Sequence, residues 1–225
     1  MKLCILIPVL NEEQCILDNL DYYKQLQQQA SLLFIDGNSS DNTITLLQKN
    51  HFQYIHSHAK GRGAQLHKGL SHDHMSECIL FLHADTKLPE DFLTDITNAL
   101  ETNYWGRFNV KINSSKSIYR IIEKLMDLRS CITGIATGDQ AIFARTDIAR
   151  QQLNDLSNYP LMEDIYISRQ LKNISRPACV QASVITSARY WEKHGVIKTI
   201  ISMWWYRLQF YFGVPPNKLY KRYYR

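Results

Sequence analysis

The 225-residue sequence has no run of about 20 apolar residues, the length that a helix needs to cross a bilayer. Its first apolar stretch, residues 3–10, is short, contains Pro8 and leads directly into Asn11-Glu12-Glu13. A signal peptide would have a longer apolar segment followed by a cleavage site. We therefore expect a buried strand at residues 2–9, and neither a secretion signal nor a membrane-spanning helix.

The sequence also has no closely spaced pair of cysteines. Its five cysteines are scattered and odd in number, and none forms a CxxC motif. This pattern argues against a zinc site and against a disulfide framework. We expect mostly buried, unpaired thiols in a protein of the reducing cytoplasm.

The excess of positive over negative charge in the chain is small. The chain has 26 Lys and Arg against 21 Asp and Glu, a net charge of +5. This balance suits an anionic partner such as a phosphate or an acidic membrane face, and it is too weak to indicate nucleic acid. The hydrophobic fraction of 45% is enough for a sizeable core.

What the sequence does contain is an alternation of strands and helices. Apolar runs predict strands at 2–9, 31–35, 52–56 and 78–82, and later at 104–112 and 139–144. Helical spacing predicts helices at 12–29, 118–128 and 162–171, with others capped by Asp41, opened by residues 61–63 and started at Pro89. This order predicts an α/β protein with an open, mostly parallel, Rossmann-like sheet flanked by helices.

Polar clusters follow three of these strands directly, at residues 11–12, 36–41 and 83–85. The carboxyl ends of parallel strands meet at one edge of a sheet, where α/β proteins bind ligands. We expect a carboxylate-lined pocket there, with Lys60 and Arg62 nearby. Such a pocket suits a diphosphate bridged by Mg²⁺ or Mn²⁺, because these ions prefer oxygen ligands and Arg can pair with phosphate oxygens.

At this point the motifs resemble those of the family 2 glycosyltransferases. The matching segments are 7–13 (IPVLNEE), 35–43 (IDGNSSDNT), 61–65 (GRGAQ), 80–86 (LFLHADT) and 162–164 (MED). Each segment is weak evidence alone, but five in the family's order make a specific signal. The resemblance implies a GT-A fold and inverting transfer of a sugar from a nucleoside-diphosphate sugar.

Further segments resemble a small bacterial subgroup of this family that has been associated with arsenosugar biosynthesis. They are 138–140 (GDQ), 187–195 (SARYWEKHG) and 214–216 (VPP). The subgroup suggests a small acceptor molecule, whereas the C-terminal segment described below suggests a lipid-linked one. Both alternatives stay open at this point, as do the donor sugar and its base.

The resemblance also implies roles for individual residues on the donor side. Pro8, Leu10 and Glu12 would border the base and ribose, and Asp36 would accept hydrogen bonds from them. Ala84 belongs to the same donor set, with Arg62 facing the diphosphate. Asp85 stands at the metal-binding position of the family's DXD motif.

His83 stands where that motif has its first aspartate, and this is a departure from the family pattern. An imidazole can bind Mn²⁺ but removes one negative charge from the site. Either Asp85 suffices together with the diphosphate, which we favour, or metal affinity is weak.

On the acceptor side, the resemblance makes Asp164 the general base, with Glu163 beside it. Asp139 and Gln140, together with Arg189 and Trp191, would flank the acceptor or the diphosphate. Asp164 would take the proton of the acceptor hydroxyl as it attacks the anomeric carbon. The metal and Arg62 would neutralise the departing diphosphate.

The C-terminal segment is apolar at helical spacing and then basic and aromatic. We expect residues 1–190 to form the GT-A domain and residues 191–225 to form an amphipathic helix and tail. Aromatic and basic residues together suit a headgroup interface, so residues 197–225 are expected to touch the cytoplasmic face of a membrane. Packing of this helix on the protein core or in a homodimer is the alternative.

Three other functions remain to be separated from sugar transfer. A catalytically weak nucleotide-sugar binding protein is suggested by His83 but opposed by the intact Glu163-Asp164 pair. A nucleotidyltransferase on a related fold usually has a basic, glycine-rich loop after the first strand, and Asn11-Glu12-Glu13 stands there instead. A scaffold protein anchored by its C-terminal helix would not bind nucleotides.

Overall fold

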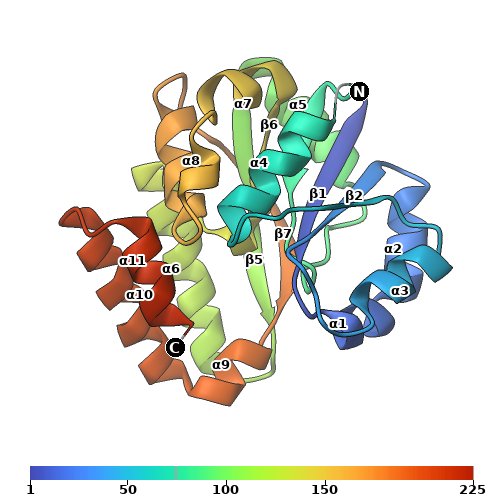
Figure 1. Ribbon diagram of the computed structural model, residues 1–225. Coiled ribbons are helices and arrows are strands. Elements are labelled where there is room, and N and C mark those ends of the chain that lie inside the picture. The colour runs from blue at the N-terminus through green and yellow to red at the C-terminus, as the bar shows by residue number, and fades with distance from the viewer. Residues whose placement is uncertain (74, 225) are drawn as a thin grey trace.

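The computed structural model describes residues 1–73 and 75–224 (Figure 1). Arg225, the last residue of the predicted C-terminal extension, lies outside the described residues. Seven strands form one sheet in the order β3-β2-β1-β4-β6-β5-β7. They are β1 (Leu3–Val9), β2 (Ser31–Asp36), β3 (Tyr54–His56), β4 (Cys78–Phe81), β5 (Trp105–Asn113), β6 (Phe143–Arg145) and β7 (Ala178–Ser187).

The sheet is mostly parallel, as the sequence predicts. β1 pairs in parallel with β2 and β4, β2 pairs in parallel with β3, and β5 pairs in parallel with β7. Strand β6 is antiparallel to both of its neighbours. All seven residues of β1 are buried, because helices cover both of its faces.

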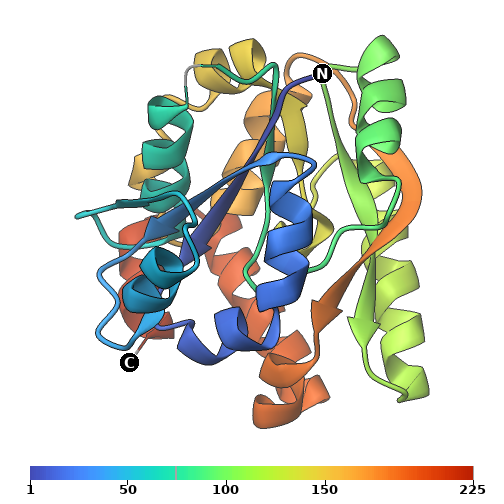
Figure 2. The ribbon, with the colours of Figure 1, turned by 90° about the vertical axis from the view of Figure 1, so that its right-hand side faces the viewer.

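Helices cover the two faces of the sheet in two layers (Figures 1 and 2). One core cluster joins the sheet to α1 (Glu13–Asp18), α2 (Leu20–Gln27), α3 (Thr43–Lys49) and α5 (Phe92–Thr102). The other joins it to α4 (Arg62–His72), α7 (Thr146–Gln152) and α8 (Glu163–Lys172).

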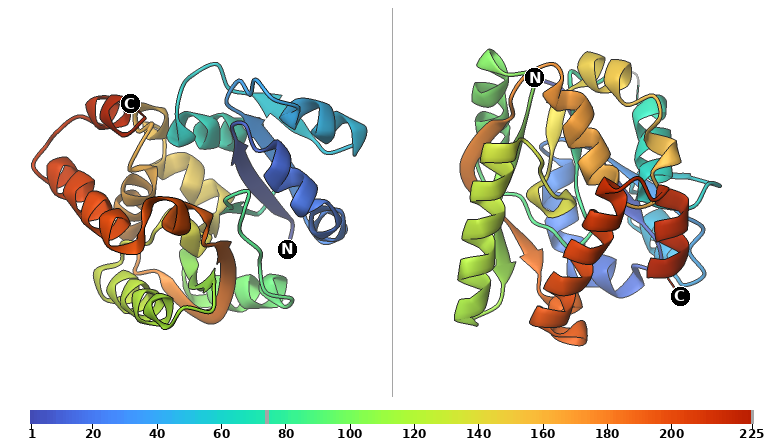
Figure 3. Two further views of the ribbon diagram at one scale, coloured as in Figure 1. Left: turned by 90° about the horizontal axis from the view of Figure 1, so that it is seen from below. Right: turned by 90° about the vertical axis from the view of Figure 1, so that its left-hand side faces the viewer.

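A third, smaller apolar cluster connects the end of β5 with α6 (Ser117–Thr133), α9 (Arg189–His194) and α10 (Val196–Tyr211). The right-hand view of Figure 3 shows α6 and α10 next to each other on one flank. The chain then continues into α11 (Pro216–Tyr223), which lies beside α10 (Figures 1 and 3).

Two predicted helices differ in their limits. The helix expected at 12–29 breaks at Asn19, whose side-chain amide donates to the carbonyl oxygen of Cys15 and so competes with the helical pattern. Pro89 does not start a helix. Its carbonyl oxygen accepts the N–H of Phe92 in a turn, and α5 begins at Phe92.

Two further predictions differ from the structure in detail. Residues 139–144 are not one strand, because Gly138–Gln140 form a 3₁₀ turn and β6 begins at Phe143. Asp41 stands one residue before Asn42, the N-cap position of α3, but its carboxylate accepts the N–H of Thr43 at the start of that helix. The same carboxylate accepts the N–H of Glu13, and thereby joins two loops of the site edge.

The cysteines follow the prediction in part. Cys4, Cys15 and Cys78 are buried free thiols, as expected. Cys131 on α6 and Cys179 on β7 form a disulfide, which the scattered spacing did not predict. A disulfide is more typical of oxidising compartments, so the cysteines no longer support a reducing cytoplasm.

Candidate active site

The loops at the carboxyl edge of the sheet hold non-glycine residues in left-handed backbone conformations. Asn11 (φ 55°), Asn38 (φ 71°), Ala141 (φ 44°) and Met162 (φ 66°) each lie in one of these loops. Such conformations cost free energy and persist where the surrounding structure holds them, most often near functional sites. Four separate segments are therefore strained around one edge, which marks it as the candidate site.

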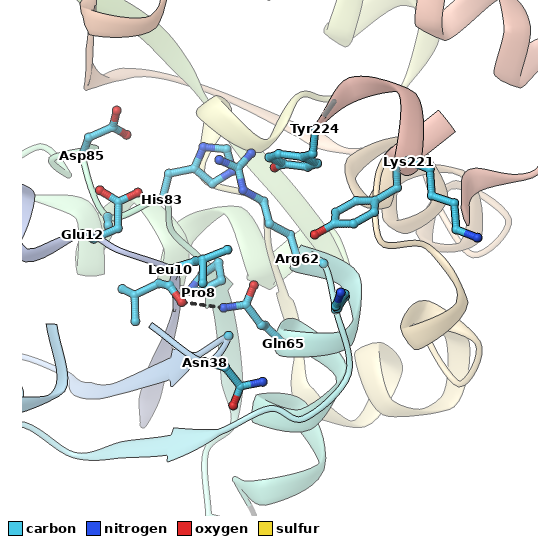
Figure 4. Close-up of a pocket in the computed structure, with 16 residues that line it drawn as sticks. Pro8, Leu10, Glu12, Asn38, Arg62, Gln65, His83, Asp85, Lys221 and Tyr224 are labelled. Carbon is cyan, nitrogen blue, oxygen red and sulfur yellow. Dashed lines mark hydrogen bonds between the residues drawn. The ribbon is translucent and has the colours of Figure 1, made fainter. Parts of the chain in front are cut away.

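A cavity of about 740 Å³ opens at this edge (Figure 4). Its volume lies within the usual range for ligand pockets. Six of the predicted donor residues line it: Pro8, Leu10, Glu12, Arg62, Ala84 and Asp85. Figure 4 shows Glu12 and Asp85 side by side, across the cavity from Tyr224 and the Arg62 guanidinium.

Helix α4 is held at this cavity by one side chain and by close backbone contact. The Gln65 amide donates to the carbonyl oxygens of Val9, the last residue of β1, and of Ile35, the last but one of β2, at 2.8 and 2.7 Å. A Cβ atom on Gly63 would lie 2.2 Å from the carbonyl oxygen of Tyr159. Glycine thus lets the start of α4 approach the loop before α8, which brings Arg62 next to Glu163-Asp164.

Asp36 does not face the cavity, and its predicted contact with the base or ribose is not supported. Its carboxylate is almost fully buried and accepts the N–H groups of Asn38 and Ser39, with His56 Nδ1 at 3.1 Å. These bonds hold the turn after β2. Gly37 and Asn38 line the cavity in its place.

A second, smaller cavity of about 210 Å³ adjoins the first and shares Arg62, His83 and Asp85 with it. The predicted residues Asp139, Glu163, Asp164 and Trp191 line it. The two carboxylates of α8 stand in its first turn, where the helix dipole favours negative charge. Burial, followed by the neighbouring Asp164, raises the pKa of Glu163 to about 7.

His83 is fixed by a carboxylate and by a glycine. Its Nδ1 lies 3.2 Å from Asp139 Oδ1. Burial alone would raise the pKa of Asp139, but the hydrogen bond and charge of His83 hold it below its usual value. A Cβ atom on Gly138 would lie 2.4 Å from His83 Nε2, so the ring is packed against that backbone.

Gln140 is placed away from both cavities, contrary to its predicted role. Its side chain is fully buried and its amide donates to Asp127 Oδ1 and to Ser130 Oγ. Its side-chain oxygen accepts the N–H of Thr137. Gln140 therefore fixes the 3₁₀ turn that presents Asp139, rather than contacting a ligand.

Arg189 lies between the two carboxylates on the far side of the donor cavity. Its Nη2 is 4.0 Å from Glu12 Oε2 and 3.8 Å from Asp85 Oδ2. Burial, and then the charge of Asp85, raise the pKa of Glu12 above its ordinary value. The guanidinium thus balances part of a negative charge that a bound cation would also balance.

Metal ligands are few in the described part of the chain. Within 1–73 and 75–224, no group of three or more His, Cys, Asp or Glu side chains could hold a metal by itself. Mg²⁺ and similar ions are usually held by one or two carboxylates, with substrate phosphates and water completing the shell. Asp85, with Glu12 beside it, fits that pattern once a diphosphate is present.

The C-terminal helices contribute residues to both cavities that the sequence patterns did not predict. Tyr220, Lys221 and Tyr224 line the larger cavity. The smaller one is also lined by Met203, Tyr206, Arg207 and Tyr223. The basic and aromatic composition of this segment predicts contact with a membrane or packing on the protein, but neither prediction puts these side chains in the cavities.

The raised pKa of Glu163 gives a testable dependence of stability on pH. The buried carboxyl holds its proton up to about pH 7, whereas in the unfolded chain it ionises near 4.5. Folding stability is therefore lost as pH rises between these values. We expect Glu163→Gln to unfold at a higher urea concentration than wild type at pH 8. Its free energy of unfolding should be greater by on the order of 3 kcal/mol at pH 8 and equal to that of wild type near pH 4.

Urea denaturation at both pH values measures this difference, with the exposed Glu90→Gln as the control. Equal stability of wild type and Glu163→Gln at pH 8 would contradict the assignment of a protonated, buried Glu163.

An open, mostly parallel sheet whose carboxyl edge carries two adjoining polar cavities defines an α/β protein with its candidate ligand site at that edge. The chain belongs to glycosyl transferase family 2, whose model matches residues 4–148, well over half of its length. No curated protein matches the chain. The family prediction made from the five motifs is confirmed, and the GT-A fold with it.

Solved structures of similar fold are also glycosyltransferases or carry nucleotide sugars. S. aureus TarS 1-349 matches with a TM-score of 0.64 at 16% identity, over 84% of this chain and 61% of that one. A mannosyltransferase from Pyrobaculum calidifontis in complex with GDP-Man and Mn²⁺ matches with a TM-score of 0.63 at 15% identity, over 82% and 56%. This chain therefore spans about three fifths of the length of these structures.

Proposed function

We propose that this protein transfers a sugar, with inversion, from a nucleoside-diphosphate sugar to an acceptor hydroxyl. The observation that carries the proposal is the pair of adjoining cavities. The larger is lined by the family's donor residues, the smaller by Glu163 and Asp164, and both share Arg62, His83 and Asp85. The donor's anomeric carbon would stand where the two cavities meet.

In this arrangement Asp164 acts as general base on the acceptor hydroxyl. Arg62 faces the leaving diphosphate and offsets the charge that develops on it. His83 is oriented by Asp139, and Glu163 stands beside the base. A divalent cation at Asp85, with His83 as a second candidate ligand, would supply further charge neutralisation for the diphosphate when bound.

Direct displacement with one base needs no covalent intermediate and therefore no nucleophile from the protein. A nucleotide-sugar binding protein without activity and a nucleotidyltransferase are the competing functions. At the finer level, we retain the subgroup associated with arsenosugar biosynthesis as a proposal. The support is the match of segments 138–140 and 187–195 to that subgroup.

A panel of nucleoside diphosphates and nucleotide sugars, with and without Mn²⁺, tests the proposal by thermal shift. A ligand that binds the folded state raises the melting temperature according to its occupancy. We expect the nucleoside diphosphate of one base to raise the melting temperature in a Mn²⁺-dependent way. The protein should then release that nucleoside diphosphate from the matching nucleotide sugar. Binding without release from any donor would favour the non-enzymatic alternative.

We propose in addition that the flank formed by α6 and α10 rests on the cytoplasmic face of a membrane, where nucleotide sugars are available. The described residues contain no helix that is long and apolar enough to span a bilayer. Two neighbouring helices nevertheless expose large apolar side chains. They are Ile118, Ile121, Leu125, Leu128 and Ile132 on α6, and Ile197, Ile201, Trp204, Trp205 and Leu208 on α10.

Charge distribution favours a lipid surface over a second copy of the chain. Segments 116–132 and 189–224 hold 11 Lys and Arg against three Asp and Glu, although the whole chain has 26 against 21. A symmetric dimer through this flank would bring two basic faces together, whereas an anionic leaflet would attract one. The apolar stripe with flanking basic residues is typical of interfacial helices.

Sedimentation with vesicles of phosphatidylglycerol and phosphatidylcholine tests this contact. We expect the protein to pellet with anionic vesicles at low salt. A double variant with Leu125→Glu and Trp205→Glu should bind the vesicles about a hundredfold more weakly, because each substitution removes the burial of a large apolar side chain. Leu17→Glu, on the exposed face of α1, is the matched control. Protein that stays in the supernatant and elutes as a dimer would refute membrane contact.

A further inference from the structure

The candidate base is paired with an arginine that the family motifs do not include. Arg207 of α10 has its Nη2 3.7 Å from Asp164 Oδ2. The two side chains are mostly buried, with 21% and 17% of their surfaces exposed. Both line the smaller cavity, so the pair stands in the wall of the proposed acceptor site.

A second arginine stands behind this pair. Nη2 of Arg129, on α6, is buried and has no hydrogen-bond acceptor among the described residues. The charged groups near it are Arg207 and Asp164. Burial, and then the charge of Arg207, lower the pKa of Arg129 to about 10. Arg129 and Arg207 therefore both lie near Asp164, and Arg129 Nη2 has no hydrogen-bond partner of its own in the described part of the chain.

A buried guanidinium nitrogen without an acceptor is unfavourable unless an anion binds beside it. Buried donors are nearly always hydrogen-bonded, and a buried charge without a partner costs several kcal/mol. Asp139 also lies near Arg207, but its carboxylate is bonded to His83, and Asp85 pairs with Arg189. Neither carboxylate supplies the acceptor that Arg129 Nη2 lacks.

We propose that the acceptor carries an oxyanion, of the phosphate type, close to its nucleophilic hydroxyl, and that Arg207, positioned by Arg129, binds it. The inference rests on the proposed sugar transfer and names the acceptor class. A guanidinium matches phosphate oxygens with two parallel hydrogen bonds. The cavity of about 210 Å³ is smaller than a usual pocket for a whole ligand, so it admits a headgroup-sized part of the acceptor.

Binding of this anion would also release the base. Arg207 is directed at Asp164. An acceptor oxyanion would take over Arg207, which leaves the Asp164 oxygen free to accept the hydroxyl proton. Arg207 is thus an acceptor-binding residue, and Arg129 is a positioning residue that acts through it.

The test uses the full chain saturated with Mn²⁺ and with whichever nucleoside diphosphate stabilises it, so that the donor site is filled. Glycerol 3-phosphate is titrated by calorimetry, and glycerol serves as the uncharged probe. We expect glycerol 3-phosphate to bind and glycerol not to bind. Arg207→Gln and Arg129→Gln should each lower the affinity for glycerol 3-phosphate by about tenfold to a hundredfold. Arg145 is exposed and lies at the edge of the sheet opposite the cavities. Arg145→Gln should therefore leave the affinity for glycerol 3-phosphate unchanged.

Three results would overturn the proposal. They are equal binding of glycerol and glycerol 3-phosphate, binding of neither probe, and arginine variants that melt at lower temperature but keep full affinity for glycerol 3-phosphate. Because nucleoside diphosphate binding is measured in the same samples, its retention separates these failures from failure of the proposed function.

The source of the oxyanion is distinguished by product analysis. The donor is incubated with glycerol 3-phosphate or with phosphatidylglycerol vesicles, and sugar-bearing product is sought by mass spectrometry in the aqueous and the lipid phase. A soluble product indicates a free phosphate ester, and a lipid product indicates a headgroup. Transfer to uncharged acceptors alone would contradict the inference.

Discussion

Replacing Asp164 with asparagine should lower the rate of sugar transfer by about 10²–10⁴-fold, the usual contribution of a general base. The amide keeps the size of the side chain and its place in the first turn of α8. It cannot take a proton from the acceptor hydroxyl. Steady-state release of nucleoside diphosphate in the presence of acceptor measures the loss, and donor binding by thermal shift should be retained.

The control for this prediction is Asp147→Asn, which neutralises an exposed aspartate in the first turn of α7. It should transfer sugar at the wild-type rate. If Asp164→Asn stays within a few-fold of wild type, the base is another residue. Glu163 would be the next candidate, because it lines the same cavity.

The sheet and the donor cavity could be predicted from sequence because their signals are local. A parallel strand buried on both faces is a continuous apolar run, and its first polar residue marks the carboxyl edge. Glu12 and Asp85 belong to the polar segments that follow β1 and β4, and both line the larger cavity. Topology alone brings them together.

Other parts of the site depend on side-chain direction and long-range packing, which sequence spacing does not report. Asp36 ends β2 beside the cavity, but the turn after it takes both of its oxygens. Gln140 points inward to Asp127 and Ser130. The pairing of Arg207 with Asp164 requires α10 to fold back against α6, and nothing in the local sequence fixes that return.

Strand β7 and helix α11 were missed for a related reason. The strand at Ala178–Ser187 is half-exposed, and its alternation of polar and apolar residues is irregular. A bulge interrupts its register with β5 between Phe108 and Asn109. Its pairing is therefore determined by β5, a partner about 70 residues earlier in the chain.

Replacing Asp85 with asparagine should abolish the Mn²⁺-dependent part of donor binding. At a donor concentration of 100 times its Kd, binding stabilises the folded state by about 2.7 kcal/mol, which raises the melting temperature of a chain of this size by roughly 5–10 °C. Wild type should show this rise with Mn²⁺ and nucleoside diphosphate together. Asp85→Asn should show a small rise that is the same with and without Mn²⁺.

Asp85 is the decisive position because, among the described residues that line the donor cavity, Glu12 is the one other carboxylate. Glu12 lies beside it, but Arg189 faces both carboxylates, and His83 is turned toward Asp139 and Gly138. A cation must therefore recruit Asp85 and the diphosphate together, so metal and nucleotide should each raise the affinity for the other. The exposed Glu90→Gln serves as the control and should keep the full response. A Mn²⁺-dependent rise that survives in Asp85→Asn would show that the metal is held elsewhere, and the diphosphate would then depend on Arg62.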